Sequence, residues 1–125
     1  MNIVILRGNL ARDPELRVIS NGGKQTSVVN FTVATSREFT RANGTKDKVT
    51  SFIPCEAWDS GAETIQSSFK KGDLVFVEGS LRNDTWEKDG VKHSSLKLRV
   101  SNFSKITKLR KKSEDDSKEL ENVTF

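Results

Sequence analysis

Alternating apolar and polar positions are the main pattern in this chain, and they predict strands. Val29, Phe31 and Val33 alternate with polar or small residues, which is typical of a strand with one buried and one wetter face. Further strands are predicted over residues 2–10, 49–58 and 74–82, and a last strand carries Leu96, Leu98 and Val100 on one face.

Turn-forming residues separate these strands. Asp13-Pro14 predicts a turn, and Asn21-Gly22-Gly23 predicts a hairpin turn, where a positive φ is easily adopted. Residues 37–48 are basic and polar and predict a loop with Asn43-Gly44 at its tip. Residues 86–92 predict a hairpin extension that turns at Asp89-Gly90.

One short helix is predicted after the strand that ends at residue 58. Ser60 and Glu63 have the spacing of a capping box, Ile65 and Phe69 fall on one face, and Gly72 can close the helix. This order predicts an all-β fold, a five-stranded OB-fold barrel with one short helix between strands 3 and 4, hairpin extensions and a mobile C-terminal tail. We expect the domain to span residues 1–106 and a flexible tail to span residues 107–125.

The third predicted strand has the most informative alternation. Ile53, Cys55 and Ala57 share one face, whereas Phe52, Glu56 and Trp58 share the other with Pro54. An unpaired carboxylate is costly to bury, so the face with Glu56 is predicted to be the wetter one. Large aromatic side chains there suit stacking on nucleobases. The alternatives are packing under a loop or against another subunit, and a bulge would exchange the two faces.

Two other aromatic residues, Phe39 and Trp86, fall in the predicted loop and hairpin extension and are candidates for the same role. The remaining phenylalanines follow regular strand or helix patterns. We expect these to lie in the core, namely Phe31, Phe69, Phe76 and Phe103.

The charge is unevenly distributed. Residues 1–112 hold 20 of the 21 Lys and Arg but only 12 of the 17 Asp and Glu, a balance of +8, whereas residues 113–125 have a balance of −4. A basic body favours a polyanionic partner. Cations that accompany the aromatic residues are candidates for phosphate contacts, namely Arg37, Arg41, Lys48, Lys71, Arg82, Lys88, Lys97 and Arg99.

The sequence offers little for catalysis, and we expect neither enzyme activity nor a metal or cofactor. Cys55 and His93 are the only residues of their types, too few soft ligands for a structural zinc site. We expect Cys55 to be a buried small hydrophobe and His93 to be exposed, while turn carboxylates such as Asp13 and Glu15 leave a magnesium-dependent nuclease as a weak alternative. The longest apolar run, residues 3–6, is too short to span a membrane, and the N-terminus has no signal-peptide pattern.

The chain resembles the bacterial-type single-stranded DNA-binding proteins across roughly residues 2–108. The matching segments, in order, are residues 5–10 (ILRGNL), 13–17 (DPELR), 21–23 (NGG), 31–36 (FTVATS), 70–73 (KKGD) and 77–82 (VEGSLR). The resemblance implies that Phe39, Phe52, Trp58 and Trp86 stack on bases and that Lys71 and Arg82 contact phosphates. Asp84 and Thr85 stand where relatives are commonly basic.

The resemblance also implies a homo-tetramer built through the first strand, and residues 3–6 are apolar on both faces. In this family an acidic tip docks replication and repair proteins. Glu119, Glu121 and Phe125 match that tip, although Thr124 stands in place of its usual proline. The short tail suggests a compact or phage-encoded member.

We therefore expect sequence-independent binding of single-stranded DNA in replication, recombination and repair, in the cytoplasm of a bacterium or a phage-infected cell. The alternative is an OB-fold module that loads replication proteins and binds nucleic acid only secondarily. A preference for RNA stays open, because stacking does not read the 2′-hydroxyl.

Overall fold

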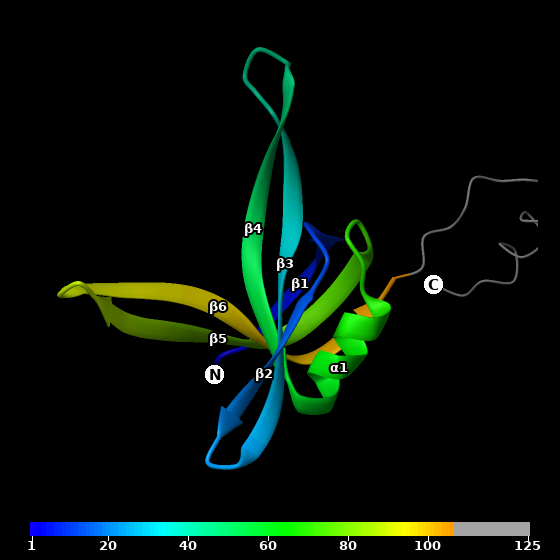
Figure 1. Ribbon diagram of the computed structural model, residues 1–125. Coiled ribbons are helices and arrows are strands. Elements are labelled where there is room, and N and C mark those ends of the chain that lie inside the picture. The colour runs from blue at the N-terminus through cyan, green and yellow to red at the C-terminus, as the bar shows by residue number, and fades with distance from the viewer. Residues whose placement is uncertain (107–125) are drawn as a thin grey trace, which may run out of the picture.

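The computed structural model describes residues 1–106 of the chain (Figure 1). Strands dominate this part, and the one helix in it lies between the fourth and fifth strands. The elements are β1 (Val4–Leu10), β2 (Glu15–Asn21), β3 (Lys24–Thr40), β4 (Lys46–Trp58), α1 (Asp59–Ser68), β5 (Leu74–Lys88) and β6 (Val91–Lys105).

Five strands form a closed ring in the order β1-β5-β6-β4-β3, because β1 also pairs with β3 at Asn9 and Leu10. The neighbours in the ring are antiparallel except β4 and β6, which are parallel. The predicted five-stranded OB-type fold is therefore confirmed. β2 is an additional strand that pairs only with β3, across the predicted turn at Gly22 and Gly23, and it places the helix after the fourth strand rather than the third.

The core lies inside this ring and is covered by α1. Ile65 of α1 and Phe69, the C-cap residue of this helix, are both buried, as their spacing predicts. Phe69 makes edge-to-face contacts with Phe31 and Phe103, with ring centroids 6.1 Å and 5.8 Å apart. Phe76 was predicted to join them, but this prediction is wrong: it is opposite Arg7 on the outward side of β5 and only half-buried.

The start of the helix also differs from the prediction. The N-cap residue is Trp58, which makes no side-chain capping hydrogen bond, and Ser60 already lies inside the helix. Asp59 follows with a φ of 57°, so the chain turns sharply from β4 into α1 before a capping box can form. The carboxylate of Glu63 instead lies 3.4 Å from the hydroxyl of Ser27.

Besides the β2–β3 hairpin, two further hairpins project from the ring in different directions (Figure 1). One is formed by the ends of β3 and β4, and the predicted loop over residues 37–48 is in fact mostly ladder, with unpaired residues only at 41–45. The other is formed by β5 and β6 and turns at Asp89 and Gly90, as predicted. The candidate site residues of these regions are therefore held on strands, except Arg41, which lies in the turn over residues 41–45.

Residues 107–125 lie outside the described part of the chain. The prediction of a mobile tail, and the candidate docking residues Glu119, Glu121 and Phe125, fall there. No helix found within residues 1–106 is long and apolar enough to cross a membrane.

Candidate nucleic-acid interface

The outward side of β4 carries Phe52 and Trp58, the aromatic residues that the alternating sequence pattern predicts there. β4 pairs with β3 without a register shift, so no bulge exchanges its two faces. Cys55 and Ala57 point into the core, and Phe52 and Trp58 point outward, as predicted. Phe52 is 63% exposed, which is a large apolar surface to leave in water without a partner.

Trp58 is more enclosed than Phe52. It is half-buried, and its indole Nε1 is shielded from solvent and has no hydrogen-bond acceptor among residues 1–106. The guanidinium of Arg99 lies over its ring, 5.2 Å from the centroid. This cation–π contact holds a positive charge beside an aromatic surface, the combination that suits a base and its phosphate.

The same outward side continues across β6 and β5. Glu56 of β4 pairs with Arg99 of β6 in the parallel ladder, and paired residues point to the same side of a sheet. In the β5–β6 ladder, Arg82 is opposite Lys97, and Trp86 is opposite His93. We call this surface the aromatic face and define it by Phe52, Trp58, Trp86, Arg82, Lys97, Arg99 and, at the hairpin end, Lys88.

An ion-pair network lies in the middle of the aromatic face. The Nζ atom of Lys97 is 3.2 Å from Oε2 of Glu56, and it also pairs with the carboxylate of Asp84. The hydrogen bond to Asp84 and then the one to Glu56 raise the pKa of Lys97, against the opposing effect of desolvation. Glu56 lies on the predicted side of β4, but it is buried rather than wet, because Lys97 covers it.

The other cations of the aromatic face are not compensated in this way. Arg82 and Lys88 are exposed, and within residues 1–106 neither forms an ion pair, nor does Arg99. Among these candidates, Lys97 therefore has the least charge to offer a phosphate.

Phe39 lies on a different side of its hairpin. Phe39 is opposite Asp47 and shares its side of the hairpin with Arg37. Phe52 and its partner Ala34 lie on the other side, as do Lys48 and its partner Glu38. Phe39 is half-buried, with the guanidinium of Arg41 5.4 Å from its ring centroid. Ladder register therefore groups Phe52, Trp58 and Trp86 but does not group Phe39 with them.

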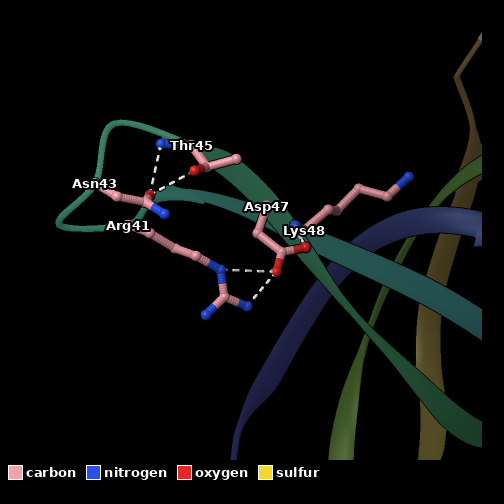
Figure 2. Close-up of polar contacts among 5 residues, drawn as sticks. All are labelled: Arg41, Asn43, Thr45, Asp47 and Lys48. Carbon is pink, nitrogen blue, oxygen red and sulfur yellow. Dashed lines mark hydrogen bonds and ion pairs between the residues drawn. The ribbon is translucent and has the colours of Figure 1, made fainter.

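Arg41 is tied down at the tip of the β3–β4 hairpin. Its Nε donates to Oδ2 of Asp47 at 3.1 Å, and the Lys48 backbone N–H donates to Oδ1 at 2.7 Å. Figure 2 shows these contacts, together with the Asn43–Thr45 hydrogen bonds that close the tip, and the Lys48 side chain extending away from them. The Arg41 hydrogen bond, followed by the Lys48 N–H, lowers the pKa of Asp47.

Lys71 lies away from the aromatic strands, in the connection between α1 and β5. Its backbone N–H donates to Oδ1 of Asp13 at 2.8 Å, and its side chain is exposed. It is thus placed beside the β1–β2 link.

Arg12 is a candidate that the sequence analysis missed. It lines a hollow of about 230 Å³ next to the aromatic face, with Asn30, Thr32, Pro54 and Lys97 among the other walls. These residues come from four separate segments, so only the folded ring brings them together. The sequence points to this hollow only through hydrogen-bonding side chains on the outward side of β3, such as that of Asn30.

Within residues 1–106, no three His, Cys, Asp or Glu side chains gather in a way that could hold a metal ion. Cys55 is buried, and this burial raises the pKa of its thiol to about 12. His93 is exposed, as predicted.

Comparisons with known proteins point to one family. The model of the single-strand binding protein family matches residues 1–106. The chain is 32% identical to single-stranded DNA-binding protein 2 of Chlorobaculum tepidum over 117 residues, which cover 93% of this chain and 78% of that protein. It is 39% identical to the single-stranded DNA-binding protein of Lactiplantibacillus plantarum over 105 residues, 83% of this chain, and spans half the length of that relative.

Solved structures agree in fold. A deletion mutant of the single-stranded DNA-binding protein from Thermus aquaticus superposes with a TM-score of 0.72 at 30% identity, covering 86% of this chain and 51% of that one. The Plasmodium falciparum single-stranded DNA-binding protein, in complex with single-stranded DNA, superposes with a TM-score of 0.74 over 86% of this chain and 96% of that one. At 20% identity, the second likeness supports the fold alone.

Proposed function

Because the chain belongs to the single-strand binding protein family, we propose that it binds single-stranded DNA without reading its sequence. The observation that carries this proposal is the aromatic face, where ladder register aligns Phe52, Trp58 and Trp86 on one side of three neighbouring strands. Aromatic rings can stack on any base, and cations interleaved with them can contact phosphates.

Binding would use the two kinds of group in different ways. Each phosphate contact by a Lys or Arg releases condensed counterions, so affinity would fall as salt rises. Stacking on the rings needs unpaired bases, so a duplex would bind much more weakly. In this way the protein would cover single strands that are exposed during replication, recombination and repair. This role is binding and needs no catalysis.

The test is a titration of the protein into a fluorescently labelled oligo-dT, read by anisotropy at several salt concentrations, with a matched duplex as the control. The proposal predicts saturable binding of the single strand, with log affinity falling linearly with log salt. Equal binding of single strand and duplex would contradict it.

We further propose that copies of the chain assemble through β1, up to the tetramer that the resemblance implies. Ile5 of this strand and Ile3, which lies just before it, are each 59% exposed. Within residues 1–106, β1 pairs with β3 only at Asn9 and Leu10, so no strand of this part of the chain pairs with that edge of its earlier residues. Light scattering should report a multiple of the 14.0 kDa chain mass, and Ile5→Asp should lower it.

For the acidic segment over residues 113–125, we propose docking of replication and repair proteins, in the cytoplasm where such DNA is processed. The support is its negative charge and its apolar Phe125. Deleting residues 113–125 should abolish capture of such partners while preserving the affinity for oligo-dT.

A further inference from the structure

Trp86 and His93 form a stacked pair near the end of the β5–β6 hairpin. The two residues are directly opposite each other in the ladder, and their ring centroids are 5.5 Å apart with an angle of 18° between the rings. Trp86 is 48% exposed, and His93 is exposed as well. The hairpin therefore presents two nearly parallel flat rings to solvent.

An open cavity lies beside this pair. Its volume is about 490 Å³, and its walls include both rings together with Thr85, Glu87, Lys92 and Ser94. Flat rings at the edge of such a space can take a planar ligand on their open sides. A nucleobase is a planar ligand of this kind.

We propose that His93 is a base-stacking residue that forms a two-ring platform with Trp86 for a base of single-stranded DNA. This proposal rests on the proposed function. The imidazole adds flat ring surface beside that of Trp86, and a base can stack on such a surface.

Charged side chains surround His93. Asp84 and Lys88 flank it on the same side of β5, and Glu87 and Lys92 line the adjacent cavity. Asp84 is itself paired with Lys97. His93 is also the only histidine in the chain, so a substitution there removes this imidazole alone.

The experiment measures the affinity for a labelled oligo-dT at one fixed pH and one fixed salt concentration, for the wild type, His93→Phe and His93→Gln. His93→Phe should match the wild type, because it keeps a flat ring at this position. His93→Gln should bind about 5-fold more weakly, because it removes one stacking ring.

Lys92→Gln is the matched control. It removes a neighbouring charge but no ring, so it should lower affinity less than His93→Gln does, and thermal melts should show that each variant is folded. If His93→Gln binds as the wild type does, or if His93→Phe binds as weakly as His93→Gln, the role of His93 is refuted while the proposed function stands. If the wild type binds no oligo-dT, both fail.

Discussion

The guanidinium of Arg99 on β6 lies 5.2 Å from the ring centroid of Trp58 at the end of β4. The two residues are 41 positions apart in the sequence, and the parallel pairing of Glu56 with Arg99 brings them together. An aromatic ring and a cation are thus held in contact before any ligand arrives. A base that stacks on Trp58 would use ring surface that Arg99 leaves uncovered, with the guanidinium close to its phosphate.

Trp58→Ala should weaken binding of oligo-dT by about 1–3 kcal/mol, the range typical of OB folds that bind single strands, this family included. The thermal midpoint should change little, because Trp58 lies outside the buried core cluster. Anisotropy titrations and thermal melts check the two expectations. A variant that unfolds instead would assign Trp58 to the core.

Asp84→Asn should increase affinity several-fold at low salt. The substitution releases Lys97 from one of its two carboxylates and removes a negative charge from the aromatic face. The slope of log affinity against log salt should steepen, because more positive charge then meets the phosphates. Glu63→Gln on α1 makes the same charge change elsewhere and should leave the slope unaltered, whereas an unaltered slope in Asp84→Asn would contradict the prediction.

Lys97→Met should destabilise the fold by about 2–3 kcal/mol, because it leaves the Glu56 carboxylate buried without a partner. Replacing both residues, as Glu56→Leu with Lys97→Met, should recover most of this loss. Chemical denaturation of the two variants checks the pair, and a double variant no more stable than Lys97→Met would contradict it.

The same ion pairs predict loss of stability in alkali. The pKa of Lys97 is raised above its ordinary value of 10.5 in the fold, so the protonated form is favoured there. The resulting contribution is complete below about pH 10.5 and is lost as the pH rises through the raised pKa. Melting temperatures measured from about pH 9 to about pH 12 should fall more steeply for the wild type than for Lys97→Met.

Gly79→Ala should destabilise the protein by about 3 kcal/mol or more. A Cβ atom at this position would lie 1.9 Å from the carbonyl oxygen of Arg99, at the bulge in the β5–β6 ladder. Gly22→Ala is the control, because its Cβ would meet no atom of the described part of the chain within 4 Å and only the positive φ is unfavourable, at about 1 kcal/mol. Equal losses in the two variants would contradict this account.

The sequence predicts the alternation of β4 correctly because its inward side is uniformly apolar or small, from Ile53 to Ala57. The sequence wrongly predicts that Glu56 is exposed to water. Its burial depends on Lys97, a partner 41 residues away that the parallel β4–β6 pairing brings close. The sequence also fails for residues 37–48, because a hairpin that leaves the ring is wet on both sides and shows no apolar alternation.

Phe76 and the Trp86–His93 pair also depend on strand pairing, which the sequence alone does not reveal. A phenylalanine in a run of apolar residues suggests the core, but the ladder places Phe76 opposite Arg7 on the outward side. The stacking of Trp86 on His93 follows from the register of the β5–β6 hairpin, which neither residue type reveals by itself.

The chain contains two tryptophans, and both belong to the aromatic face, so tryptophan fluorescence during titration with oligo-dT reports on the central claim most directly. If bases stack on these rings, the wild type should be strongly quenched at saturation, and Trp58→Phe and Trp86→Phe should each lose part of that quenching. Saturable binding by anisotropy with unchanged fluorescence would show that DNA binds elsewhere and would contradict the account.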